Sequence, residues 1–189
     1  MTKKYDSILL DIDNTITELQ PTLDLMAKEF NREPVSAEDV LDFKLARAYN
    51  LTSEEEKSFW TGYDIELAER SELAVERVQN MLDTYTHEDT TIFVVTMRPQ
   101  ESYEATFNWL RANNINFDTL ICLGQESKVD YALDFGIEAI FEDNADVFEE
   151  IKRRELEDKF DLFVVDYPYN KPVDNAVRLD RKTGKEINK

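Results

Sequence analysis

The sequence predicts an α/β protein built on a parallel sheet with helices on both faces. From residue 90 onward, short runs rich in β-branched and aromatic residues alternate with segments of helical periodicity. Such alternation is typical of a parallel sheet, because each return to the sheet needs a crossover helix. A further apolar run lies near the amino terminus, and the stretch between it and residue 90 has only helical patterns. We therefore expect a Rossmann-like core with a small helical cap inserted after its first strand.

The amino-terminal half begins with one expected strand and continues with helices. The strand lies within the stretch Ser7-Ile8-Leu9-Leu10-Asp11-Ile12-Asp13-Asn14-Thr15. Pro21 suits the first turn of a helix running to about residue 31, because that turn does not need the amide hydrogen that proline lacks. Ser36 with Asp39 resembles a capping box for a helix over residues 37–48. Two more helices are predicted, from residue 52 or 53 toward residue 69 and from 71 to about 84.

The carboxyl-terminal half supplies the remaining strands. They are predicted at residues 91–96, 118–123, 139–141 and 162–165, with a further short one at 176–179, and helices at 100–113, 128–135 and 145–159. We assign residues 1–18 and 70–180 to the α/β core and residues 19–69 to the cap. The C-terminal tail, residues 181–189, is expected to fray.

Charge and cysteine content narrow the possible partners. The 189 residues include 22 basic and 41 acidic side chains, a net charge of −19 that disfavours binding to polymeric nucleic acid or an anionic membrane. A single cysteine, Cys122, cannot form an internal disulfide, which fits a reducing cytoplasm. No apolar run approaches the length of a membrane span, and no charged leader precedes one. We expect a soluble cytoplasmic protein, whose oligomeric state the sequence leaves open.

Polar side chains follow several of the expected strands. They are Asp11 and Asp13 after the first strand, Thr96 after the second, Glu142 with Asp143 after the strand at 139–141, and Lys128 at the start of the preceding helix. Each has an ordinary explanation as a turn, cap or surface residue. Because parallel strands bring their carboxyl ends to one edge of the sheet, however, these residues are expected to meet in one crevice. Their joint occurrence predicts a ligand site there.

The same residues resemble the four ordered motifs of the haloacid dehalogenase (HAD) superfamily of phosphatases. The resemblance extends from residue 5 to about 168 and includes a helical insert after the first motif. Residues 128–144 and 164–170 are similar to the cytosolic 5′(3′)-deoxyribonucleotidase family and its bacterial and phage relatives. Asn14 stands where such nucleotidases commonly have glycine, and asparagine tolerates the left-handed backbone better than most residues.

The resemblance implies a role for each residue of the predicted site. Asp11 would attack phosphorus and form an aspartyl-phosphate, and Asp13 would protonate the leaving oxygen and then activate water. The cofactor Mg²⁺ would be held by Asp11, the backbone carbonyl of Asp13 and Asp143, with Glu142 acting through water. Phosphate oxygens would be bound by Thr96, Lys128 and, as a second cation, Arg98, which is equally well explained as a surface residue before a proline turn. The substrate would be a small phosphorylated metabolite, with a nucleoside monophosphate as the leading candidate.

Substrate specificity is expected to come from the cap and the last strand. Phe43, Phe59 and Trp60 could stack on a base or sugar, although most cap aromatics are expected to form the core of the cap. Tyr167 could reach the ligand from the sheet edge, or belong to a turn that merely ends the strand.

Other functions stay open at this point. A receiver-type signalling domain uses similar acidic residues, but places the phosphorylated aspartate at a later strand. A phosphatase of nucleic acid 3′ ends fits the negative charge poorly, and the substrate could also be another small phosphometabolite. A catalytically idle scaffold would have no need to keep both Asp11 and Asp13.

Overall fold

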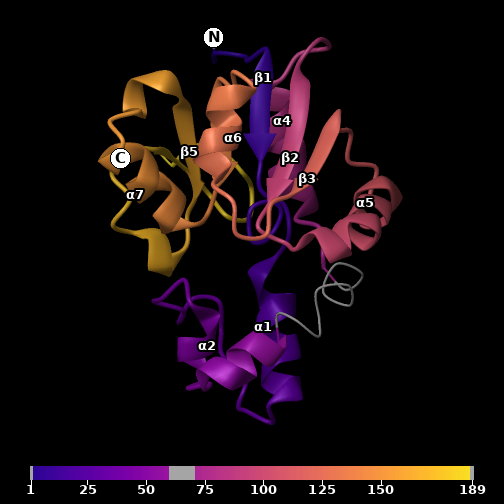
Figure 1. Cartoon of the computed structure of the whole chain (residues 1–189), viewed down its shortest axis with the longest axis vertical. Helices are drawn as coiled ribbons and strands as arrows, with labels where there is room; N and C mark the ends of the chain where they lie inside the picture. The colour runs from indigo at the N-terminus through magenta and orange to yellow at the C-terminus, as the bar shows by residue number, and fades with distance from the viewer. Residues whose placement is uncertain (1, 60–70, 188–189) are drawn as a thin grey trace.

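The computed structural model describes residues 2–59 and 71–187. Within them, an α/β core stands over a smaller helical lobe (Figure 1). The core sheet has six strands, all paired in parallel. They are β1 (Ser7–Leu10), β2 (Thr91–Thr96), β3 (Thr119–Cys122), β4 (Ala139–Glu142), β5 (Asp161–Val165) and β6 (Val177–Leu179). The predicted fold class is therefore confirmed.

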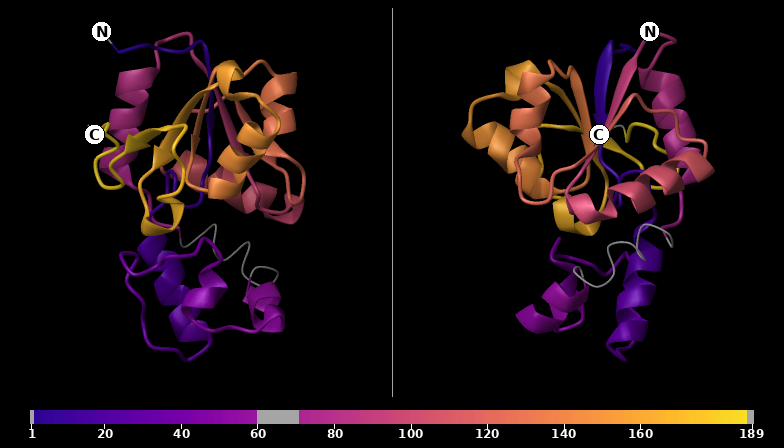
Figure 2. Two further views of the ribbon diagram at one scale, coloured as in Figure 1. Left: turned by 90° about the vertical axis from the view of Figure 1, so that its left-hand side faces the viewer. Right: turned by 45° about the vertical axis from the view of Figure 1, so that its right-hand side comes forward.

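Helices cover both faces of the sheet (Figure 2). They are α4 (Val75–Tyr85) and α5 (Tyr103–Ala112) on one face, and α6 (Lys128–Asp134) and α7 (Ala145–Arg153) on the other. Residues of β1 alternate between the two cores: Ile8 and Leu10 pack with α4 and α5, while Leu9 packs with α6 and α7. Because both faces of β1 are covered, its sequence is an unbroken apolar run rather than an alternating one.

The strand order is β3-β2-β1-β4-β5-β6. The chain builds outward from β1 on one side, then crosses to β4 on its other side. Ligands of open α/β sheets bind where the order reverses in this way, at the carboxyl ends of the strands. Receiver-type domains have the order 2-1-3-4-5 instead, so the topology argues against the signalling alternative.

The helical lobe faces that edge of the sheet (Figure 1). Its described helices are α1 (Leu19–Glu29), α2 (Leu45–Ala48) and residues 53–59. Its apolar cluster also includes three residues that follow or end β5, namely Val165, Tyr167 and Tyr169. The cap is thus packed onto the core through this corner. Residues 69 and 70 lie outside the described part, so the second cap boundary stays a prediction.

Two predicted helices of the first half differ from the structure. Residues 37–44 are irregular, and within the predicted range only Leu45–Ala48 is helical, so the helix over 37–48 was wrong. The side chain of Asp42 accepts the backbone N–H of Lys44 at 2.9 Å, a local bond that competes with helix formation. The helix expected from residue 71 begins at Val75. Leu73 instead pairs with Thr17 in an antiparallel bridge that joins the two chain segments between core and cap.

In the second half of the chain, the structure differs from the prediction at the helix over residues 145–159 and at the C-terminal tail. The helix predicted over residues 145–159 ends at Arg153, and Glu155 has a left-handed φ of 56°. The tail was expected to fray, but residues 181–187 are packed against the core. The Asn80 amide donates to the Thr183 carbonyl at 2.7 Å, and Tyr85 Oη donates to Glu186 at 2.9 Å.

None of the helices within residues 2–59 and 71–187 combines the length and apolar character that a bilayer-spanning helix requires.

Candidate active site

The first strand ends in a tight turn that presents two carboxylates. Asp11 still pairs with the sheet, since its N–H donates to the Phe141 carbonyl at 3.0 Å. The Ile12 carbonyl then accepts the N–H groups of Thr15, Ile16 and Thr17 at 3.2, 3.0 and 3.0 Å. Asn14 occupies the left-handed region with φ 65°, a backbone that asparagine tolerates better than most residues. The turn directly follows β1 and leaves both Asp11 and Asp13 at the carboxyl edge of the sheet.

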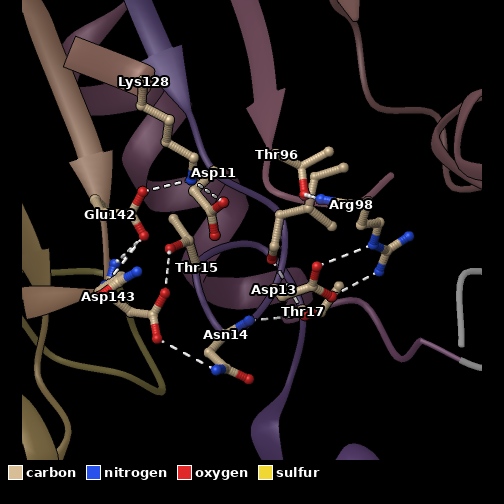
Figure 3. Close-up of polar contacts among 12 residues, drawn as sticks. Asp11, Asp13, Asn14, Thr15, Thr17, Thr96, Arg98, Lys128, Glu142 and Asp143 are labelled. Carbon is tan, nitrogen blue, oxygen red and sulfur yellow. Dashed lines mark hydrogen bonds and ion pairs between the residues drawn. The ribbon is translucent and has the colours of Figure 1, made fainter. Parts of the chain in front are cut away.

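Three buried carboxylates meet at this edge. Oxygens of Asp11, Glu142 and Asp143 all lie within 4.8 Å of one another. Lys128, itself buried, donates to Asp11 and also to Glu142, the latter at 2.5 Å (Figure 3). The other oxygen of Glu142 accepts the N–H groups of Asp143 and Asn144, both at 3.0 Å. Glu142 therefore uses both of its oxygens within the protein.

Asp143 is held by side chains from two different elements. Its Oδ2 accepts from Tyr169 Oη at 2.5 Å and from the Asn14 amide at 3.2 Å. The Asn170 amide donates to the Asp143 backbone carbonyl at 2.9 Å. Tyr169 and Asn170 lie in a 3-10 turn after β5, η3 (Pro168–Asn170). Tyr169 was not among the predicted site residues. The signal that could have found it is its position just past a strand end at the same sheet edge.

The charges of this cluster do not balance. Burial raises the pKa of Asp11 to about 7, and Glu142 adds to the rise while Lys128 opposes it. The pKa of Asp143 also lies well above its ordinary range, chiefly because of burial and the nearby Glu142 and Asp11 carboxylates. Three carboxylates face a single lysine, which leaves an excess of two negative charges when all are ionised. A divalent cation with a preference for oxygen ligands, such as Mg²⁺, fits both the charge and the donor set.

Asp13 faces away from the carboxylate cluster, toward Arg98 (Figure 3). Arg98 Nε donates to one oxygen of Asp13 at 2.9 Å and Nη2 to the other at 2.6 Å. Thr96, at the end of β2, is buried, and its Oγ1 accepts the backbone N–H of Arg98 at 3.2 Å. The Asp13 side chain stays 34% exposed, so it is accessible from the neighbouring cleft.

A cleft of about 490 Å³ contains these groups and extends to the cap. From the core it is lined by Asp11, Asp13, Thr96, Arg98, Lys128, Glu142 and Asp143, among others, and from the cap by Phe43, Lys44, Leu45 and Glu56. The structure thus brings together all the predicted catalytic, phosphate and metal residues. Lys44 and Glu56 were not predicted, because nothing in the sequence shows which side of the cap faces the core.

Of the predicted substrate-pocket residues that the structure describes, one lines the cleft and two do not. Phe43 lines the cleft and meets Tyr169 edge-on, with ring centroids 5.7 Å apart. Phe59 does not line the cleft: it is fully buried in the cap and packs against Phe30 at 6.2 Å. Tyr167 is also buried outside the cleft lining, stacked on Tyr169 at 5.1 Å. Trp60 lies outside the described residues.

Comparison with known proteins gives related sequences over most of the chain. No family model matches it. A nucleotidase of Clostridium acetobutylicum is 28% identical over 175 residues, which cover 92% of this chain and 88% of the relative. A protein of Halalkalibacterium halodurans and YqfW of Bacillus subtilis, both carrying provisional nucleotidase names, are each 26% identical, over 96% and 90% of this chain. Over most of its length, this chain is thus similar to proteins that carry nucleotidase names.

Solved structures agree with the fold of this nucleotidase relative. A Thermotoga maritima protein provisionally described as a β-phosphoglucomutase has a TM-score of 0.55 and 13% identity, covering 94% of this chain and 95% of its own. A provisionally described phosphatase of Clostridium difficile has a TM-score of 0.52 and 16% identity, with coverage of 86% and 85%. The predicted similarity to nucleotidases is confirmed by these relatives, and the solved structures confirm the predicted α/β fold.

Proposed function

We propose that this nucleotidase relative is a Mg²⁺-dependent phosphomonoester hydrolase that acts through an aspartyl-phosphate on nucleoside monophosphates. The observation that carries the proposal is the buried cluster of Asp11, Glu142 and Asp143 with Lys128, placed beside Asp13 in one cleft. Phosphoryl transfer depends mainly on placement and on neutralising charge, and these side chains supply a nucleophile, a proton carrier and fixed charges together.

In the first step, Asp11 attacks phosphorus. A bond forms between its carboxylate oxygen and phosphorus, the bond to the leaving oxygen breaks, and Asp13 gives a proton to that oxygen. In the second step, water attacks the aspartyl-phosphate, the bond to Asp11 breaks, and Asp13 takes the proton of the water. Dividing the hydrolysis into two displacements lets one carboxylate act first as acid and then as base.

The phosphoryl group is held by side chains at the end of β2 and the start of α6. Thr96 Oγ1 and Lys128 Nζ would bind its oxygens, and both side chains are buried at the floor of the cleft. The residues that would hold Mg²⁺ are Asp11 and Asp143 through carboxylates and Asp13 through its backbone carbonyl, with Glu142 acting through water. When bound, the ion supplies positive charge to the phosphoryl oxygens.

The substrate class rests on the relatives and on the cleft. Three relatives carry nucleotidase names, and a cleft of about 490 Å³ is within the usual range for sites of small molecules. Phe43 offers an aromatic ring at the cap side of this cleft for contact with a base or sugar. The net charge of −19 favours a small ligand over a nucleic acid polymer. The single cysteine remains the reason to place this activity in the cytoplasm.

The test is phosphate release from a panel of nucleoside monophosphates and sugar phosphates, with and without Mg²⁺. We expect release that needs Mg²⁺, is faster on nucleotides, and falls to background in Asp11→Asn. Asp134→Asn is the matched control, because it makes the same change at an exposed position of α6 outside the cleft lining. Turnover that persists in Asp11→Asn would exclude Asp11 as nucleophile. Equal rates on nucleotides and sugar phosphates would exclude a preference for nucleotides and would indicate a general phosphatase.

A further inference from the structure

The Arg98 guanidinium donates hydrogen bonds to the side chains of three residues. Its Nε and Nη2 each donate to one oxygen of Asp13. Nη1 donates to Thr106 Oγ1 at 3.2 Å, and Nη2 also donates to Ser71 Oγ at 3.0 Å. The residue is only 5% exposed. Four of the five N–H groups of this guanidinium therefore have partners. To hold a phosphate with two parallel hydrogen bonds, Arg98 would have to release Asp13 or its supporting hydroxyl groups.

The partners of Arg98 are themselves fixed. Thr106 is fully buried in α5, and the Arg98 backbone carbonyl accepts the Gly124 N–H at 3.1 Å. The Ser71 carbonyl accepts Trp109 Nε1 at 2.8 Å, which ties this segment to the same helix. Contacts with α5 and with the segment returning from the cap thus fix the guanidinium plane independently of Asp13.

A bidentate pair fixes the plane of a carboxylate, because two parallel hydrogen bonds allow only one orientation. A carboxylate has about four lone-pair sites, so the pair with Arg98 leaves one on each oxygen of Asp13. The Asp13 side chain is 34% exposed, on the side of the cleft. Arg98 thereby fixes the orientation in which the Asp13 carboxylate faces the cleft.

We propose that Arg98 is a positioning residue, which orients the Asp13 carboxylate for proton transfer to the leaving oxygen, and that Thr106 and Ser71 hold its guanidinium. The proposal rests on the acid–base role given to Asp13 under the proposed function. It assigns Arg98 to the leaving-group side of the reaction rather than to the phosphate.

The test separates these two roles by the leaving group. A nucleoside needs a proton as it departs, whereas dinitrophenolate does not. We compare wild type, Arg98→Gln and Arg98→Lys on a nucleoside monophosphate and on dinitrophenyl phosphate. The burst of dinitrophenol measures the first step alone, and inhibition by inorganic phosphate measures phosphate binding.

For Arg98→Gln we expect kcat on the nucleotide to fall about 100-fold or more, the usual size of general acid catalysis. The dinitrophenol burst should fall less than about tenfold, and inhibition by inorganic phosphate should be unchanged. Arg98→Lys should recover little, because an ammonium cannot form the bidentate pair. Thr106→Val, which keeps the side-chain shape, should show the same leaving-group dependence to a smaller extent.

Two results would overturn the proposal. Equal losses on both substrates, with weaker inhibition by phosphate, would make Arg98 a phosphate ligand. Equal losses together with a lower melting temperature would make its role structural. Failure of the proposed function is seen separately, because wild type would then release no phosphate or Asp11→Asn would remain active.

Discussion

At the scale of single residues, one lysine cannot balance the carboxylates around it. Lys128 contacts Asp11 and Glu142, while the donors to Asp143 among the described residues are the neutral side chains of Tyr169, Asn14 and Thr15. Burying ionised groups without compensation is costly, and the raised pKa values of Asp11 and Asp143 express this cost. The metal-free site is therefore expected to hold protons that a cation would displace.

Mg²⁺ affinity should depend on pH for this reason. The pKa of Asp11 is about 7 in the folded chain against an ordinary value of 3.8. Below about pH 7, each ion must displace a proton, so affinity should rise up to about tenfold per pH unit and then level off. Titration calorimetry at several pH values measures this. Affinity that does not change between about pH 5.5 and 8 would contradict it.

The same shift predicts how stability depends on pH without metal. A carboxyl whose pKa is raised by folding adds stability below its unfolded pKa and loses it as pH rises through the folded one. The metal-free protein should thus become less stable as the pH rises from about 4 to about 7, and Mg²⁺ should offset the loss.

Tyr169 offers a sharper test of the metal site. Tyr169→Phe removes the hydroxyl that donates to Asp143 and should weaken Mg²⁺ binding about tenfold or more, as loss of a supporting hydrogen bond usually does. Tyr167→Phe is the matched control, because Tyr167 stacks on the same ring but its hydroxyl contacts Arg77. Equal effects of the two variants would show that the Tyr169 hydroxyl does not support the metal site.

The residues that could be predicted from sequence are those that follow strands. Asp11, Thr96 and Asp143 lie at strand ends, and parallel pairing alone brings them together. The contacts of Tyr169 and Arg98 could not be predicted in this way. They depend on the path of a turn and on side-chain directions, neither of which has a periodic signal.

At the scale of elements, the C-terminal segment is part of the core. Gly184 has a left-handed φ of 67°, and a Cβ there would lie 2.5 Å from the Arg77 carbonyl oxygen of α4. Close packing of backbone on backbone explains why residues 181–187 do not fray. Composition alone suggested a loose tail, because a polar sequence does not show hydrogen bonds to a distant helix.

Gly184→Ala should therefore be strongly destabilising. We expect it to lose at least about 2 kcal/mol more than Gly136→Ala, because overpacking adds to the backbone strain. Gly136 is the matched control, since its φ is 63° and nothing lies within 4 Å of its added Cβ. Urea denaturation of both variants measures the difference. Equal losses would mean that the segment does not pack on α4.

The prediction of a helix over residues 37–48 was wrong because the sequence does not show which local hydrogen bonds form. Ser36 and Asp39 resemble a helix start, but Asp39 N–H donates to the Ser36 carbonyl at 2.9 Å in a turn. Serine and aspartate favour turns as readily as helix starts. The core strands could be predicted because their apolar runs favour burial in the sheet and contain no residues that favour turns.

At the scale of the whole molecule, cap and core share one apolar cluster. Val165, Tyr167 and Tyr169 of the core pack with α1 and α2 of the cap. Arg77 strengthens the junction from α4, donating to the Thr17 carbonyl at 2.6 Å. Cap and core are therefore expected to unfold together.

Mg²⁺ should stabilise the cap as well as the site. At about 100 times its dissociation constant, a ligand adds about 2.7 kcal/mol to the free energy of unfolding. Hydrogen exchange should show similar added protection in α1 and β1, and none in Asp143→Asn. Protection confined to β1 would mean that the cap opens independently.

The proposed mechanism requires above all that Asp11 accepts the phosphoryl group. The direct measurement is rapid quenching of the protein with a radiolabelled phosphate ester and Mg²⁺, followed by location of the protein-bound label. We expect hydroxylamine-sensitive label on Asp11 in wild type and none in Asp11→Asn. Turnover without protein-bound label, or label on another residue, would contradict this role of Asp11.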